Sequence, residues 1–244
     1  MIKLVLFDIM TYMIYEIGSL IQNGFSFSRI LAFVIGYILA IMIAFGMHEY
    51  AHALTAYKLG DYTPKALGRL TINPLKHIDI YGLIGFLVVG FGWAKPVEVN
   101  PLNFKKYRRD MFLVSIAGVL TNLLLAFVFS GLFFFFFKFV ASYDASGNFS
   151  YANDLLYLIH YFLEFSIILN IALFCFNLIP IYPLDGFNAI KSLFRLNNKF
   201  LNFMYRWGNL ILIIVIITPF FDIFYGFVTE FITKTFLSFW GLFV

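Results

Sequence analysis

The chain is dominated by apolar runs that are long enough to cross a lipid bilayer. Residues 29–58, 110–141 and 155–180 are apolar over most of their length, and a helix needs about 20 apolar residues to cross the hydrocarbon core. Charged residues make up 12% of the 244 residues, whereas an average soluble domain carries roughly 25%. Because so few polar side chains cannot cover the surface of a soluble fold, the sequence predicts an all-α polytopic membrane protein.

Two further apolar segments flank these runs. Residues 4–22 suit either a first span or a helix that lies in the membrane interface. Residues 207–244 are broken at Pro219 and are long enough for two short spans or one bent span. We therefore expect a single integral membrane domain over residues 1–244.

A shorter apolar segment, residues 83–92, has too few residues for a helical span. Valine-rich runs lie on either side of Gly90 and Gly92, a pattern typical of two strands joined by a turn. The sequence predicts a β-hairpin over residues 83–99 that dips into the membrane, where its backbone has to be covered by protein or line a wet cavity. Its free edge can pair with an extended peptide. The alternative is a short interfacial loop.

Basic residues are concentrated in two connections, within residues 58–109 and 191–206. The connection from 142 to 154 has no lysine or arginine and carries Asp144 and Asp154 instead. By the positive-inside rule, the first two connections are cytoplasmic and the third is external. This distribution favours a multi-pass protein of a prokaryotic plasma membrane. It argues against a nucleic-acid partner, because the basic residues follow the topology and are not interleaved with aromatic residues in a soluble domain.

A polar cluster follows the apolar stretch 31–45, and it reads His48-Glu49-x-x-His52. On a helix, histidines four positions apart lie on the same face, so both imidazoles can bind one metal ion. Glu49 projects beside them, within reach of a water at the metal whose proton it takes as a general base. Ionisable groups at membrane depth are costly and indicate function. The motif is that of a zinc peptidase with its active site toward the cytoplasmic side.

A catalytic zinc site has three protein ligands and one open position, so a third ligand is needed. Lysine at position 58 excludes the longer histidine pattern of the metzincins. The remaining candidates are His77, Asp61, Asp79, Asp110, His160, Glu164 and Asp185.

Asp185 is the carboxylate expected at the right depth. It follows Pro180 and Pro183 at the cytoplasmic end of its span, and His52 also lies at a cytoplasmic helix end. His160 and Glu164 precede it by more than twenty residues in the same span, about 30 Å along a helix. The other carboxylates suit loop charges or caps, and His77 suits a residue that orients others. The alternative for Asp185 is the cap of the next short helix.

A row of small and polar residues, Ser115, Gly118 and Asn122, shares one face of the helix expected at 110–141. Asn122 offers both a donor and an acceptor at membrane depth, which favours a functional role over helix packing. Gly118 alone is better explained by close packing of helices.

Residues 40 to 190 resemble the site-2 proteases, a family of intramembrane zinc metalloproteases, in a short form without PDZ or CBS domains. The matching motifs are His48-Glu49-x-x-His52, Leu59-Gly60-Asp61, Gly68-Arg69-Leu70-Thr71-x-Asn73-Pro74-x-x-His77-Ile78-Asp79, Phe91-Gly92-Trp93-Ala94-Lys95-Pro96-Val97, Ser115-x-Ala117-Gly118-x-x-x-Asn122 and Phe176-Asn177-x-x-Pro180-Ile181-x-Pro183-Leu184-Asp185-Gly186.

The resemblance implies about six transmembrane helices and a role for each matching residue. It implies three ligands for one catalytic Zn²⁺ ion, namely His48, His52 and Asp185. It implies that Glu49 is the catalytic base and acid, and that Asn122 holds the substrate carbonyl or oxyanion. Further candidates for substrate binding are Gly92, Trp93 and Asn177.

We therefore expect hydrolysis of a peptide bond within or near the transmembrane segment of a membrane protein, either as regulated intramembrane proteolysis or as clearance of remnant signal peptides. The catalytic core is expected over residues 29–186, and C-terminal spans over 207–244. A metal-dependent membrane transporter is one alternative, but transporters tend to have internal repeats and this sequence has none that we detect. A catalytically silent scaffold of the same fold is another, and it would not need Glu49.

Overall fold

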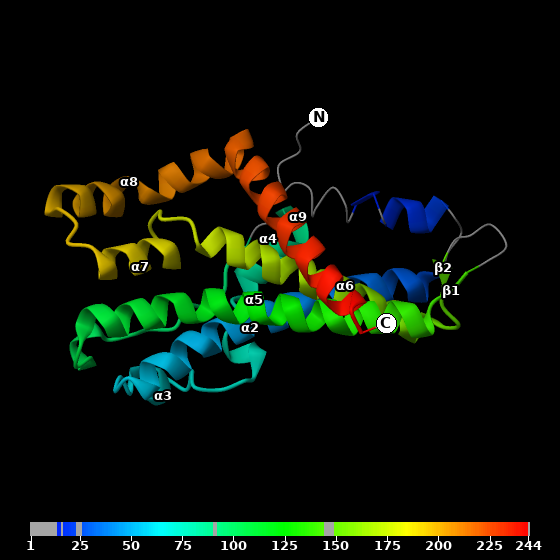
Figure 1. The fold of residues 1–244 in the computed structure, drawn as a ribbon, viewed down its shortest axis with the longest axis horizontal. Coiled ribbons are helices and arrows are strands. Elements are labelled where there is room, and N and C mark those ends of the chain that lie inside the picture. Colours follow the sequence, from blue (N-terminus) through cyan, green and yellow to red (C-terminus); the bar gives the residue numbers. More distant parts are fainter. Residues whose placement is uncertain (1–13, 16, 23–25, 90–91, 144–148, 244) are drawn as a thin grey trace.

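The computed structural model describes residues 14–15, 17–22, 26–89, 92–143 and 149–243 (Figure 1). The named elements, in chain order, are α2 (Phe27–Lys58), α3 (Thr63–Ala66), η1 (Pro74–Lys76), α4 (Ile80–Val89), η2 (Pro101–Asn103), α5 (Tyr107–Val140), β1 (Ser142–Tyr143), β2 (Phe149–Ser150), α6 (Asp154–Asn177), α7 (Asp185–Leu193), α8 (Asn198–Ile217) and α9 (Pro219–Gly241). Residues 14–15 and 17–22 are also helical. The rest of the segment expected at 4–22 lies outside the described residues.

Four of the described helices, α2, α5, α6 and α8, have the length and hydropathy needed to cross a membrane. They cover the three long runs expected from the sequence and the first part of the C-terminal run. Helix α2 contains 32 residues, which at about 1.5 Å per residue exceeds the hydrocarbon thickness of about 30 Å. The expectation of a helical membrane protein is confirmed at this level.

Helices α2, α5 and α6 lie side by side and form the core (Figure 1). Phe33 and Tyr37 of α2 pack edge-on against Phe165 of α6, with ring centroids 5.2 and 4.8 Å apart. Gly36 lies between them, and a Cβ added there would be 2.9 Å from the backbone nitrogen of Phe162. The two helices therefore approach closely, because α2 has no side chain at this point.

The two ends of this bundle differ. Helix α7 packs against α5 at one end, and the short antiparallel pair of β1 and β2 lies at the other (Figure 1). Helices α8 and α9 are separated at Pro219, where the sequence predicts the break, because proline lacks a backbone N–H and is tolerated at the start of a helix. Helix α9 contacts α5, and Trp240 Nε1 donates a hydrogen bond of 3.0 Å to Ser130 Oγ.

The β-hairpin predicted over residues 83–99 is wrong in its first arm, because Ile80–Val89 form helix α4. The second arm, residues 92–99, has no regular secondary structure apart from an isolated bridge, which pairs Ala94 with Ile78 and not with the first arm. A helix satisfies its backbone hydrogen bonds internally, whereas a two-stranded hairpin leaves an edge unpaired in apolar surroundings. The apolar run that precedes the glycines therefore forms a short helix.

Candidate metal centre and active site

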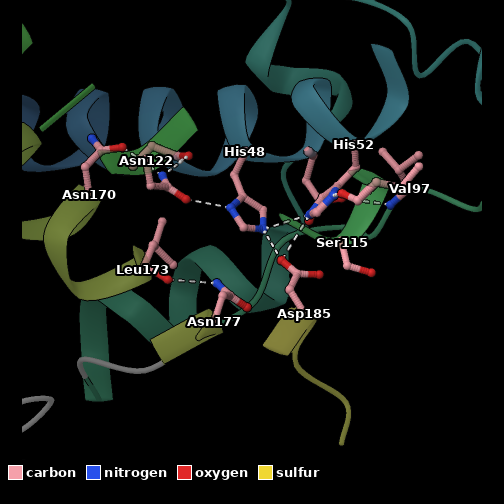
Figure 2. Close-up of polar contacts among 12 residues, drawn as sticks. His48, His52, Val97, Ser115, Asn122, Asn170, Leu173, Asn177 and Asp185 are labelled. Atoms are coloured by element: carbon pink, nitrogen blue, oxygen red, sulfur yellow. Dashed lines mark hydrogen bonds and ion pairs between the residues drawn. The ribbon is translucent and has the colours of Figure 1, made fainter. Parts of the chain in front are cut away.

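Two histidines and one aspartate converge between α2 and the start of α7 (Figure 2). His48 and His52 are buried, and their Nε2 atoms lie 3.1 Å apart. Asp185 Oδ2 lies 3.1 Å from each of these nitrogen atoms. Within the part of the chain that the structure describes, this is the group of side chains whose ligand atoms could hold one metal ion.

The position of Asp185 depends on close packing between α7 and the end of α6. Asp185 is the first residue of α7, and Gly186 follows it. A Cβ on Gly186 would lie 2.4 Å from the carbonyl oxygen of Leu178 and 2.6 Å from that of Ile179. Only a residue without a side chain lets the start of α7 sit against this backbone, so Gly186 keeps Asp185 facing the histidines.

Both histidines donate a hydrogen bond through Nδ1. His52 Nδ1 lies 2.7 Å from the carbonyl oxygen of Val114, which can only accept, so this nitrogen carries a proton. His48 Nδ1 lies 2.5 Å from Asn122 Oδ1, which also accepts. In a neutral imidazole with a protonated Nδ1, Nε2 has a free lone pair. Both Nε2 lone pairs are therefore available at the point where Asp185 approaches.

Three acceptor atoms thus meet in a buried place, and such a cluster is stable only when a cation, or protons in its stead, lies among them. Two imidazole nitrogens and one carboxylate oxygen are the ligands of a catalytic zinc site with an open fourth position. The hydrogen bonds to the far side of each imidazole are also typical of metal-binding histidines. The residues present therefore fit a zinc ion.

Glu49 lies beside this cluster and is held by residues 92–99, the segment that follows α4. Its Oε2 accepts a hydrogen bond of 2.8 Å from the backbone N–H of Val97. The segment is itself anchored, because the N–H of Lys95 donates to the carbonyl of His77 at 2.8 Å. One backbone donor thus fixes the orientation of the carboxylate.

A cavity of about 630 Å³ opens at the cluster. His48, Glu49, His52 and Asp185 all line it, and so do the three residues that the sequence singles out for substrate binding, Gly92, Trp93 and Asn177. Most of its other lining residues are apolar, among them Phe45, Phe86, Val97, Leu173 and Phe176. The cavity therefore suits an apolar polypeptide segment next to a polar reaction centre.

Asn122 lies behind His48, away from Asp185 (Figure 2). Its side chain is fully buried, and its Nδ2 donates to the carbonyl of Ala44 at 3.2 Å and to Asn170 Oδ1 at 2.8 Å. An amide has two N–H groups, so none remains for a substrate oxygen in this arrangement. The expected contact of Asn122 with the substrate stays a prediction, and the geometry favours a role through His48.

The other candidate ligands have their own hydrogen-bond partners away from the cluster. His77 pairs with the carbonyl of Thr71, Asp79 with the N–H of Gly82, Asp110 with Lys106 and Arg109, and His160 with Tyr151. Their roles are therefore local.

Asp61 is fully buried and is the most highly connected of these residues. It accepts hydrogen bonds from Thr63, Asn100 and Asn103, which ties the end of α2 to the segment that leads to α5. Burial raises the pKa of the Asp61 carboxyl, but these hydrogen bonds outweigh it and hold that pKa below its usual range.

Two residues have a role at the site that sequence reasoning missed. A Cβ on Gly118 would lie 2.5 Å from His52 Nε2 and 2.6 Å from His48 Cε1, so this glycine makes room for both imidazole rings and not only for helix packing. Asn170 contacts Asn122 and is fully buried. The available signal for Asn170 was a polar amide within the apolar run 155–180, which is the same signal that drew attention to Asn122.

The amino-acid sequence matches a known protein family. Residues 36–215 match Peptidase family M50. The chain belongs to peptidase family M50. This is the site-2 protease family, so the resemblance noted from the motifs is confirmed.

Two relatives support the M50 assignment. One, named "Putative zinc metalloprotease YwhC", from Bacillus subtilis (strain 168), is 46% identical over 64% of this chain and 68% of its own length. The other, named "Putative zinc metalloprotease Rip2", from Mycolicibacterium smegmatis (strain ATCC 700084 / mc(2)155), is 30% identical over 82% of this chain and 76% of its own length. No solved structure gives a significant match. The M50 chain is a zinc metalloprotease, as the motif and the ligand set predict.

Proposed function

We propose that this M50 protease hydrolyses a peptide bond within or near the transmembrane segment of a membrane protein substrate. The observation that carries the proposal is the joint position of the metal centre and Glu49 on α2, a helix of bilayer-spanning length, at an apolar cavity. A soluble substrate would not need an active site in such surroundings, whereas a membrane segment presents the apolar side chains that this cavity accommodates.

In the proposed reaction, His48, His52 and Asp185 hold the zinc ion. Zinc bound there supplies Lewis acidity, which polarises a peptide carbonyl and makes water a nucleophile at neutral pH. Glu49 takes a proton from the attacking water and returns it to the leaving amine. The N–H of Val97 keeps the Glu49 carboxylate turned toward the cavity during these two transfers.

The substrate is proposed to bind as an extended strand along residues 92–99. A helix uses its carbonyl groups in its own hydrogen bonds, so a transmembrane segment has to unwind before it can be cut. This segment borders the cavity at Gly92 and Trp93, and its backbone groups are proposed to pair with the unwound strand. Asn177 is proposed to bind a substrate carbonyl, because it also lines the cavity.

The proposed membrane orientation places the metal centre toward the cytoplasm. Lys58 is the last residue of α2, near the histidines, and the basic residues of the following connection begin there, whereas Asp154 begins α6 next to β2 at the other end of the bundle (Figure 1). We further propose one membrane domain with a catalytic core over residues 29–186 and C-terminal spans over 207–244. The expected six spans require residues 4–22 and α9 to cross in addition to the four helices named above.

The test compares wild type with Glu49→Gln on a reporter that contains one transmembrane segment, in liposomes that hold the full-length protein. Glu230→Gln is the matched control, because Glu230 is an exposed carboxylate on α9 and does not line the cavity. We expect cleavage by wild type and by the control variant, and a loss of at least about 100-fold with Glu49→Gln, in the range for removal of general acid–base catalysis. Equal cleavage by all three proteins would refute the proposal.

A further inference from the structure

Three polar side chains form a hydrogen-bonded network in the apolar interior behind the metal centre (Figure 2). His48 Nδ1 lies 2.5 Å from Asn122 Oδ1, and Asn122 Nδ2 lies 2.8 Å from Asn170 Oδ1. Asn122 belongs to α5 and Asn170 to α6, and both side chains are fully buried. The polar network therefore links three neighbouring helices at membrane depth, where an unpaired amide is costly.

Two backbone carbonyl groups determine the direction of every hydrogen bond in this polar network. Asn170 Nδ2 lies 2.7 Å from the carbonyl of Ser166, which can only accept, so Asn170 Oδ1 has to face Asn122. Asn122 Nδ2 donates to that oxygen and to the carbonyl of Ala44. Asn122 Oδ1 is therefore the atom that faces His48, and it can only accept.

The direction of these bonds determines the tautomer of His48. An accepting Oδ1 requires the proton of a neutral imidazole on Nδ1, which leaves the lone pair of Nε2 free for a metal ion. If the Asn122 amide were rotated by half a turn, its N–H would face Nδ1 and the proton would move to Nε2. That tautomer cannot bind the metal, so the orientation of one amide decides whether His48 is a ligand.

We propose that Asn170 is a positioning residue of the metal centre, which acts through Asn122 to keep His48 in the metal-binding tautomer. The proposal deepens the proposed function and rests on it for the use of the zinc site. Without Asn170, the Asn122 amide keeps only the carbonyl of Ala44 as a partner for its two N–H groups, at 3.2 Å. Rotation of the amide then costs less, and a fraction of His48 loses its free Nε2.

The tautomer of His52 does not depend on an amide side chain, so the polar network acts on His48 alone. His52 Nδ1 donates directly to the backbone carbonyl of Val114, an acceptor that cannot reverse its role. The simpler alternative is that Asn122 and Asn170 only join α5 to α6, as polar residues do between membrane helices. The two explanations differ in what a change at Asn170 does to zinc binding in a folded protein.

The experiment measures zinc retention by full-length protein in detergent, with no substrate present. The variants are Asn170→Leu, which has the same branching and no hydrogen-bonding group, and Asn170→Asp, which keeps an acceptor toward Asn122. Ser166→Ala is the matched control, because its hydroxyl is buried one turn away on α6 and donates to the carbonyl of Phe162. Each protein is loaded with zinc and the rate of loss to a chelator is measured, together with helical content and the visible spectrum after Co²⁺ substitution.

We expect Asn170→Leu to lose zinc at least about 10-fold faster than wild type with helical content retained, the lower end of the range for groups that orient a metal-binding histidine. Its Co²⁺ spectrum should change, while Asn170→Asp and Ser166→Ala should stay close to wild type. Wild-type zinc retention and an unchanged Co²⁺ spectrum in Asn170→Leu would overturn the proposal. Zinc loss that accompanies unfolding in both Asn170 variants would overturn it as well. Because no proteolysis is measured, a failure of the proposed function is recognised separately.

Discussion

Replacement of Gly118 by alanine should abolish zinc binding, because the added methyl group would collide with both histidine rings. A Cβ added at Gly118 would lie 2.5 Å from His52 Nε2, 2.6 Å from His48 Cε1 and 2.8 Å from His48 Nδ1. The ordinary separation of such atoms is about 3.5 Å or more. Both rings, or the whole of α5, therefore have to move by about 1 Å to accept the methyl group.

A shift of this size should affect metal binding much more than the stability of the fold. Overpacking of this kind costs about 1–3 kcal/mol, and alanine recovers up to about 1 kcal/mol through its higher helix propensity, so the variant should still fold. Metal–ligand distances, in contrast, tolerate only about 0.2 Å. A displacement of about 1 Å is therefore incompatible with both histidines binding one zinc ion.

The assay measures zinc content and reporter cleavage for Gly118→Ala. Gly131→Ala is the matched control, because it lies on the same helix and its Cβ would be 2.6 Å from Trp240 Cζ2, far from the metal centre. We expect Gly118→Ala to fold, to lack stoichiometric zinc and to cleave at least about 100-fold more slowly, as a 1 Å misplacement can cause. Gly131→Ala should keep zinc. A Gly118→Ala protein with one zinc ion and wild-type cleavage would refute this reasoning.

Two further predictions concern Val97, which holds Glu49, and Asp61, which anchors the end of α2. Val97→Pro removes the N–H that donates a hydrogen bond to Glu49. Because a hydrogen bond to a charged group contributes about 1.5–3 kcal/mol, kcat should fall about 10-fold or more while the zinc content stays unchanged. Loss of zinc would contradict this prediction. Asp61 has a lowered pKa in the folded protein, so its ionised form stabilises the fold above the unfolded-state pKa of about 3.9, and that stabilisation is lost as the pH falls through the folded-state value. Asp61→Asn should therefore lower Tm at pH 7 and converge with wild type at acid pH, and an equal Tm difference at both pH values would count against this role of the carboxylate.

The convergence of His48, His52 and Asp185 can be predicted from the sequence because its determinants are local or set by depth. The spacing of His48 and His52 places them on one helix face whatever the fold around them. Asp185 is found because alternating spans bring it to the same depth as His52, and depth along a helix follows from residue counting. The structure brings the three together as that reasoning requires.

The remaining features depend on rotation and packing, which residue counting does not give. The depth of Asn122 is evident from the sequence, but the side that it faces depends on how α5 is rotated against α2. The contacts of Gly118 and Asn170 depend on the same rotation. Residues 83–89 are apolar without alternation, so periodicity does not distinguish a strand from a short helix there.

The position of the cut tests the central claim most directly, namely that the zinc centre between α2 and α7 hydrolyses a bond within or near a membrane segment. The measurement is mass spectrometry of the new chain ends of the reporter after incubation with wild-type or Asp185→Ala protein in liposomes. We predict ends within or next to the transmembrane segment with wild type and none with Asp185→Ala. Ends only in distant soluble parts of the reporter, or the same ends with both proteins, would contradict the account.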